Sequence, residues 1–394
     1  MREKKTTNYI SIRESRKIIK YNIKQMKYYE SLKRAKRAPE EYTTVMHDEN
    51  NIIELDGLKT CFFTDAGTVV SVNGVSFNIG KNKIVGVVGE SGCGKSVTSL
   101  SIMQLVQAPQ GQTTAGEIRF NSDALGYDEQ GRKLAYDIAK MPSHEMYNIR
   151  GKDITMIFQE PMTSLNPVFT IGYQLDEVTM LHDKTATKES AKAYSIELLK
   201  KVGISMPEHV YKSYPHELSG GMRQRVMIAM AVAGHPKLII ADEPTTALDV
   251  TIQAQILELL KSLQKQEGCS IMLITHDLGV IAEMADEVVV MYAGRVIEHG
   301  TAEEIFFHPM HPYTIGLQKS KPLLSSDASK PLYSIPGQVP NPINLPDSCY
   351  FKNRCRHCTD KCNGKYPDTV KVSDTHSVAC YLYADDNNGE GGEA

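Results

Sequence analysis

The residues with the clearest chemical role form a phosphate-binding pattern near residue 90. The segment Gly89-Glu90-Ser91-Gly92-Cys93-Gly94-Lys95-Ser96 fits the pattern G-x-x-x-x-G-K-[ST]. Its glycines let backbone N–H groups turn toward phosphate oxygens, its lysine can reach the β- and γ-phosphates, and its serine hydroxyl can ligate Mg²⁺. The pattern is credible because a buried strand is expected before it, at 84–88, and a helix after it, at 97–106. The sequence therefore predicts a nucleoside triphosphate site.

Two carboxylates follow a second apolar run, Leu238-Ile239-Ile240-Ala241. Asp242 and Glu243 stand at its end, and the carboxyl ends of parallel strands are where such sheets bind their ligands. Asp242 can hold Mg²⁺ through water, and Glu243 can orient and deprotonate an attacking water. Together with the phosphate loop, this pair predicts hydrolysis of the nucleotide.

A Ser-Gly-Gly turn opens a further predicted helix, at 222–233, within Leu218-Ser219-Gly220-Gly221-Met222-Arg223-Gln224-Arg225. Such a turn can form a second anion cradle from backbone donors and a helix N-terminus. It can equally be an N-capped helix, since Ser is a favoured cap. The residues alone leave both interpretations open.

Strands alternating with helices must position these groups. The predicted strands are 52–63, 69–79, 117–120, 154–158, 238–241, 270–275 and 287–292. Further helices are predicted at 176–202, 252–266 and 278–284, and a turn at 65–67 joins the first two strands. This alternation indicates an α/β fold built on a parallel sheet.

The first 38 residues differ in charge from the rest of the chain. They hold thirteen Lys/Arg and three Glu, a net +10, whereas the whole chain of 394 residues has a net charge of −3. A helix is predicted at 10–32, ended by Pro39 and followed by an irregular linker at 40–51. The N-terminus has no apolar signal region, and no apolar run reaches membrane-spanning length, so we expect a cytoplasmic protein.

The order of these motifs resembles that of the ATP-binding cassette (ABC) ATPases. Residues 218–225 are similar to the family signature, Gln159 stands as in its Q-loop, Ala247-Leu248-Asp249 as in its D-loop, and His276 as in its H-loop. The resemblance implies a nucleotide-binding domain with a RecA-like parallel-sheet core, an antiparallel β subdomain and a helical subdomain. It also implies ATP and Mg²⁺ as cofactors.

In that family two such domains meet head to tail, with each ATP between the phosphate loop of one and the signature of the other. The resemblance then implies that Gln159 senses Mg²⁺ or the attacking water and contacts the membrane subunit, and that His276 holds the γ-phosphate. Phe62 or Phe63 stands where the family stacks an aromatic ring on adenine, and the spacing favours Phe62. The expected catalytic residues are Lys95, Gln159, Glu243 and His276. The expected Mg²⁺ ligands are Ser96, Gln159 and Asp242. The other expected nucleotide contacts are Phe62, the loop from Gly89 to Ser96, Val97, Ser219, Gly220, Gly221 and Asp249.

The resemblance narrows to the ATPases of oligopeptide and dipeptide importers. The segments ITMIFQEPMTSLNP (154–167) and VVGESGCGKSV (87–97) are similar to theirs, as are HPYT (311–314), IPG (335–337) and the cysteine-rich end, so the similarity covers about 52–383. It implies a subunit that hydrolyses ATP on the cytoplasmic face of a membrane to power peptide import. Its implied partners are a paralogous ATPase, two permease subunits and a substrate-binding protein; its cargo stays open, and no nucleic acid is expected.

Two alternatives are weighed against this function. One is a soluble ABC ATPase acting on nucleic acid or ribosomes, against which stand the single cassette and the importer-like end. The other is an iron–sulfur or regulatory adaptor that binds ATP without turnover. The presence of both Glu243 and His276 argues against the adaptor.

Five of the eight cysteines lie between residues 349 and 380. In a reducing cytosol such a cluster suggests a metal before a disulfide, although the spacing is not that of a zinc ribbon. The importer resemblance implies a [4Fe–4S] cluster, with zinc and free thiols as alternatives. The implied ligands are Cys349, Cys355, Cys362 and Cys380, with Cys358 as an extra thiol, whereas Cys61, Cys93 and Cys269 are expected to pack in the interior.

The expected organisation has four parts. They are a basic arm and linker at 1–50, an ABC ATPase domain at 51–306, a C-terminal importer-type extension with the cysteines at 307–384, and a disordered acidic tail at 385–394. The basic arm is not part of the family pattern. We expect it to contact anionic lipid or an acidic partner surface, with a merely solvated arm as the alternative.

Overall fold

Two β-sheets carry the fold of this computed structural model, which describes residues 11–246, 248–320 and 333–384. One sheet is antiparallel, in the order β1-β6-β5-β2-β3, and the other is mostly parallel, with the order β12-β13-β11-β10-β4-β9-β8-β7. The first comprises β1 (Thr43–Val45), β2 (Asn51–Thr64), β3 (Gly67–Gly80), β5 (Gly111–Phe120) and β6 (Leu134–Asp137). The second comprises β4 (Ile84–Val88), β7 (Ile154–Ile157), β8 (Leu238–Asp242), β9 (Ser270–Ile274), β10 (Glu287–Tyr292), β11 (Arg295–Thr301), β12 (Val370–Lys371) and β13 (Ser377–Val378).

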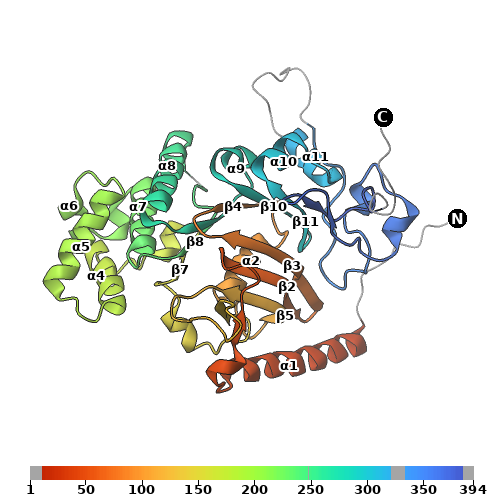
Figure 1. Cartoon of the computed structure of the whole chain (residues 1–394), viewed down its shortest axis with the longest axis horizontal. Coiled ribbons are helices and arrows are strands. Elements are labelled where there is room, and N and C mark those ends of the chain that lie inside the picture. Colours follow the sequence, from red (N-terminus) through yellow and green to blue (C-terminus); the bar gives the residue numbers. More distant parts are fainter. Residues whose placement is uncertain (1–10, 247, 321–332, 385–394) are drawn as a thin grey trace.

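Helices pack on the sheets, and one group of helices lies to one side of them (Figure 1). α2 (Lys95–Ile102) lies between the two sheets, in contact with β2, β3 and β8. A separate helical layer holds α3 (Pro161–Ser164), α4 (Ile171–His182), α5 (Lys188–Lys201), α6 (Pro207–Lys212) and α7 (Gly220–Val232). The remaining helices are α1 (Ile12–Arg34), α8 (Val250–Glu267), α9 (Leu278–Met284), α10 (Ala302–Phe307) and α11 (Pro312–Lys319).

The parallel strands form the core of the molecule. Every residue of β4, β8 and β9 is buried, as expected for a sheet covered on both faces. Apolar side chains on one face of this sheet join those of the antiparallel sheet in a single cluster around α2. The α/β fold with a parallel sheet is thus confirmed, and the phosphate-binding segment lies at its centre.

Two predictions about the elements are wrong. The helix predicted at 176–202 is two helices, α4 and α5, because the Asp183 carboxylate accepts hydrogen bonds from Thr185 and the Thr187 side chain caps α5. The linker at 40–51 is not irregular throughout, since it contains β1, which pairs with the unpredicted strand β6. The acidic tail at 385–394 lies outside the described residues.

The basic arm forms α1, a helix docked on the antiparallel sheet (Figure 1). Ser11 and Glu14 cap its start. The Asn22 side chain is 2% exposed and donates to the Thr64 backbone oxygen at 2.7 Å. The outer face of the helix carries exposed Lys and Arg side chains. The N-terminal helix is therefore held by specific contacts to the β2–β3 hairpin.

Candidate nucleotide-binding and catalytic site

The phosphate loop needs its glycines for space and for backbone geometry. Gly89 has φ 152°, and a Cβ there would lie 2.2 Å from the Met291 backbone oxygen. Gly94 has φ 102°, and a Cβ there would lie 2.4 Å from the Ser71 backbone oxygen. Because any side chain would collide at both positions, the loop folds tightly between β4 and α2 as the pattern predicted.

Lys95 points back into this loop. Its side chain is buried, and its ammonium donates to the backbone oxygens of Gly89 at 2.7 Å and Glu90 at 3.2 Å. The ammonium therefore lies inside the curl of the loop, where phosphate oxygens can replace the carbonyl oxygens as acceptors. Ser91 and Gly92 are exposed at the tip of the loop, Cys93 is buried beneath it, and Val97 packs against the core.

Ser96 and Asp242 meet at the foot of the loop. The Ser96 hydroxyl donates to Asp242 Oδ1 at 3.0 Å. Burial raises the pKa of the Asp242 carboxyl, and the neighbouring charge of Glu243 adds to that rise, against the Ser96 hydrogen bond and Lys95. A hydroxyl and a carboxylate from two elements are oxygen donors of the kind Mg²⁺ prefers, and a cation there would favour the ionised carboxylate.

Glu243 is the centre of a hydrogen-bonded cluster. Its carboxylate accepts from Gln159 Nε2 at 2.8 Å and from the Thr246 hydroxyl at 2.9 Å, and it lies 3.3 Å from His276 Nδ1. Its backbone has φ 46°, the left-handed region that non-glycine residues seldom adopt. The structure thus brings together Gln159, Glu243 and His276 from three strand ends. Sequence reasoning missed Thr246, whose only signal is its place three residues after Glu243.

The Ser-Gly-Gly turn lies in the helical layer, apart from α2 (Figure 1). Ser219 caps α7 by accepting from the Met222 backbone N–H at 3.4 Å, and both Ser219 and Gly220 are exposed. Asp249 caps α8. A Cβ at Gly220 would lie nearest Leu248, and one at Gly221 nearest Ile252. In the part of the chain that the structure describes, no hydrogen bond or ion pair joins Ser219, Gly220, Gly221 or Asp249 to the phosphate loop.

Phe62 and Phe63 point to opposite sides of the antiparallel sheet, as neighbours on a strand do. Phe63 is buried and stacks on Tyr29 of α1, with ring centroids 6.2 Å apart. Thr60, two residues before Phe62, meets Ser101 of α2 at 2.8 Å. Tyr29 of α1 thus covers the ring of Phe63, which supports the choice of Phe62 for the adenine contact.

The C-terminal extension reaches the phosphate loop, which the sequence did not reveal. Arg354 is 7% exposed and forms two hydrogen bonds to the Glu90 carboxylate, at 2.7 and 2.9 Å. This pairing raises the pKa of Arg354. The Tyr313 hydroxyl accepts from the Glu90 backbone N–H at 2.8 Å. The extension therefore fixes both the backbone and the charge of Glu90.

The four predicted cluster ligands line one small cavity. Cys349, Cys355, Cys362 and Cys380 face a space of about 30 Å³, whereas Cys358 is exposed outside it. Burial raises the pKa of the Cys349 and Cys380 thiols to about 11. Among the described residues, no three His, Cys, Asp or Glu side chains are placed to hold a metal ion. The thiols therefore share a cavity but do not form a closed ligand set. Cys61, Cys93 and Cys269 are buried, as expected for packing residues.

None of the described helices combines the length and the apolar character needed to span a membrane.

Two family profiles match the chain. Residues 72–246 match the profile described as "ABC transporter", and residues 297–362 match "Oligopeptide/dipeptide transporter, C-terminal region". The first match contains the phosphate loop, the Ser-Gly-Gly turn and Glu243. The second contains Tyr313, Arg354 and three of the four cysteines that line the cavity.

Proteins similar in sequence are named as transport ATP-binding proteins. The oligopeptide transport protein AppD of Bacillus subtilis is 48% identical over 86% of this chain and 98% of its own. The oligopeptide transport protein OppD of the same organism is 50% identical over 84% and 88%. The dipeptide transport protein DppD of Escherichia coli is 43% identical over 85% and 98%.

Among solved structures, a dimeric ATP-binding cassette, MJ0796 bound to ADP and Pi, is similar in fold. It is 26% identical, with a TM-score of 0.53, over 64% of this chain and 98% of that one. The described architecture is thus that of an ABC nucleotide-binding domain.

Proposed function

The chain belongs to the ATP-binding cassette transporter family, and we propose that it is the subunit that hydrolyses ATP to power peptide import. The similar proteins are named for oligopeptide and dipeptide transport, and the chain carries the C-terminal region of those transporters. The observation that carries the ATPase activity is the position of Glu243. Its carboxylate is held by Gln159, Thr246 and His276, one residue from the Asp242–Ser96 pair.

We propose that the phosphate loop binds ATP with Lys95 as its charged centre. The phosphate oxygens would replace the carbonyl oxygens of Gly89 and Glu90 as acceptors of the ammonium, and loop N–H groups would donate to the others. Ser96 and Asp242 would hold Mg²⁺, with Gln159 close by; the ion would offset charge on the β- and γ-phosphates.

Glu243 is the proposed general base. Its three side-chain partners fix the carboxylate, and Gln159 and His276 would turn toward the Mg²⁺ side and the γ-phosphate when ATP enters. A base held in this way can take a proton from water as the water attacks the γ-phosphate. Thr246 then serves as a positioning residue that keeps the carboxylate aimed.

A second cassette would complete the site. Among the described residues, Ser219, Gly220, Gly221 and Asp249 make no hydrogen bond or ion pair to the phosphate loop, and a helix N-terminus that opens with the exposed Gly220 suits an anion. We therefore propose that they bind the ATP held by a partner cassette, which in turn covers this chain's loop. We further propose that the partner is a paralogous ATPase.

We propose that Arg354 supports ATP binding through Glu90. A carboxylate in a loop that binds phosphates opposes that binding unless its charge is offset. Arg354 supplies the offsetting charge in a bidentate pair, so the C-terminal extension becomes a working part of the nucleotide site.

The importer assignment implies permease subunits in the membrane and a substrate-binding protein as partners. We propose that the chain lies against the cytoplasmic face of that membrane, attached through the permease subunits. The exposed Lys and Arg side chains on the outer face of α1 add a second proposal, contact with anionic lipid, since each cation near such a surface contributes about 1 kcal/mol.

A [4Fe–4S] cluster between Cys349, Cys355, Cys362 and Cys380 stays a prediction. The shared cavity and the four thiols support it, whereas the failure of these thiols to form a ligand set stands against it. No step of ATP hydrolysis runs through it. The proposed division of the chain is an arm and linker (1–50), a cassette (51–306) and an extension (307–384).

Transport by reconstituted vesicles tests the function. The complete transporter, with this chain, should accumulate a labelled peptide only when ATP is present on the side of this subunit. Peptide accumulation without ATP, or ATP hydrolysis stimulated by nucleic acid rather than by peptide-loaded binding protein, would contradict the proposal. The second result would favour the alternative of an ATPase acting on nucleic acid or ribosomes.

A further inference from the structure

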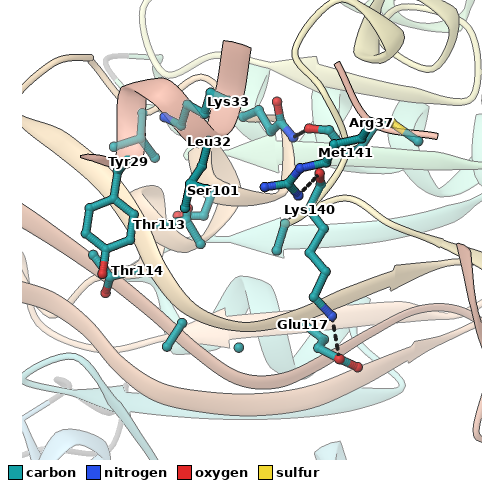
Figure 2. A pocket seen from close by; sticks show the side chains of 15 residues that line it. Tyr29, Leu32, Lys33, Arg37, Ser101, Thr113, Thr114, Glu117, Lys140 and Met141 are labelled. Carbon is teal, nitrogen blue, oxygen red and sulfur yellow. Dashed lines mark hydrogen bonds and ion pairs between the residues drawn. The ribbon is translucent and has the colours of Figure 1, made fainter. Parts of the chain in front are cut away.

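A cavity of about 410 Å³ lies between the N-terminal helix α1 and the antiparallel sheet (Figure 2). Its walls are α1 with the residues after it, the end of α2, β5, and the turn at 139–141. Ser101 lines it six residues after Lys95, which is about 9 Å along a helix. The volume falls within the range of about 300–1,000 Å³ typical of small-molecule sites. The cavity is thus separate from the phosphate loop and large enough for a ligand.

The charges that line this cavity are unbalanced. Lys140 is already paired, since its ammonium lies 2.9 Å from both Glu117 and Asp137. Arg37 uses one nitrogen to donate to the Lys140 backbone oxygen (Figure 2). Lys33 has no hydrogen bond or ion pair within the described part of the chain, and burial lowers the pKa of its ammonium. Within the described residues, Lys33 and Arg37 therefore line the cavity without an ion pair, and the nearby carboxylate of Glu30 acts on Lys33 only through its charge.

The other walls carry apolar side chains, two free hydroxyls, and the already hydrogen-bonded side chains of Ser101, Gln104 and Thr114. Leu32, Val106 and Met141 supply apolar surface. The hydroxyls of Tyr29 and Thr113 line the cavity as well, and neither has a hydrogen-bond partner among the residues that the structure describes. A ligand that suits these walls has one anionic end for the cations and a short apolar body.

We propose that this cavity binds a small organic anion, a carboxylate or a phosphate on a short apolar body, with Lys33 and Arg37 holding the charged end. Such a ligand would fill the space between α1 and the end of α2, and so connect the N-terminal helix to the helix that begins at Lys95. The site goes beyond the ATPase function and does not depend on it. Because α1 supplies Lys33 and the segment after it supplies Arg37, the site requires the N-terminal segment.

Two probes test the site on the full chain, with the phosphate loop filled by a non-hydrolysable ATP analogue and Mg²⁺. Inorganic phosphate tests the phosphate end, and hexanoate tests the carboxylate with an apolar body. Calorimetry at low ionic strength should show saturable binding of at least one probe. Lys33→Met and Arg37→Met should each weaken it about tenfold or more, since hydrogen bonds to charged groups are strong.

The matched control is Lys24→Met, an exposed lysine on the outer face of the same helix. This variant should bind the probes as the unmodified chain does. Thermal unfolding checks folding, and Lys33→Met should be at least as stable because it removes a partly buried, unpaired ammonium. Absence of binding for both probes, or equal weakening by Lys24→Met, would overturn the proposal.

Discussion

The replacement of Arg354 by Met tests whether the C-terminal extension supports ATP binding. Arg354 is buried and pairs with Glu90 of the phosphate loop, whose side chain is 28% exposed. Methionine removes the guanidinium and keeps an apolar body of similar length. Glu90 then carries an uncompensated negative charge in the loop that must bind phosphates.

The size of the effect follows from that single charge. At a separation of about 10 Å and an effective dielectric constant of about 20, two unit charges repel by about 1.7 kcal/mol. Such a penalty corresponds to a loss of affinity of about fifteenfold. We therefore expect Arg354→Met to raise KM for ATP about fifteenfold in the assembled transporter and to leave kcat within about threefold.

The double variant Glu90→Gln/Arg354→Met separates charge from structure. If the charge of Glu90 causes the defect, its removal should restore KM to within about threefold of the original value. Arg356→Met, two residues further on and exposed, is the matched control and should change neither constant. An unchanged KM in Arg354→Met, or no rescue in the double variant, would refute the reasoning.

Three further predictions concern the docking of α1, the cysteine cluster and the basic arm. Asn22→Ala should lower the free energy of unfolding by about 1–3 kcal/mol, measured by urea denaturation, because the Thr64 backbone oxygen loses its buried donor; an unchanged midpoint would contradict the docking of α1. Anaerobically purified protein should carry about four iron and four sulfide per chain if the cluster forms, with both lost in Cys355→Ser and kept in Cys358→Ser; stoichiometric zinc would indicate a zinc site, and no metal would leave free thiols. Deletion of residues 1–38 should abolish co-sedimentation with anionic vesicles at low salt, whereas equal sedimentation would rule out the lipid contact.

The phosphate loop and the Asp242–Glu243 pair could be predicted from short local motifs, whereas the choice of Gln159 and His276 rests on the resemblance to ABC ATPases. Glu243 and Asp242 end one buried strand, and Gln159 and His276 follow two others. Parallel strands in one sheet bring their carboxyl ends to a common edge, which explains why these side chains meet once the resemblance has singled them out.

Contacts between distant segments could not be predicted in this way. Arg354 and Glu90 are separated by 264 residues, and no local pattern links them. The docking of α1 on the antiparallel sheet could not be predicted either, because an amphipathic sequence pattern indicates that one face of a helix is buried but not which element covers it. Strands as short as β1 and β6 give too few residues for a period of two to stand out.

The division of one predicted helix into α4 and α5 has a local cause. The segment 176–202 contains no glycine or proline to mark a break, which favours a single helix. At Asp183 the side chain binds the backbone and hydroxyl of Thr185, and this turn competes with helical hydrogen bonding.

Turnover by Glu243→Gln in the reconstituted transporter tests the central claim most directly. The substitution keeps the shape of the side chain but removes the base, so the rate of ATP hydrolysis should fall by a factor of about 10²–10⁴. ATP should remain bound between the two cassettes, and Glu258→Gln, an exposed position on α8, should hydrolyse at the normal rate. Hydrolysis by Glu243→Gln within a few-fold of the unmodified protein would contradict the account.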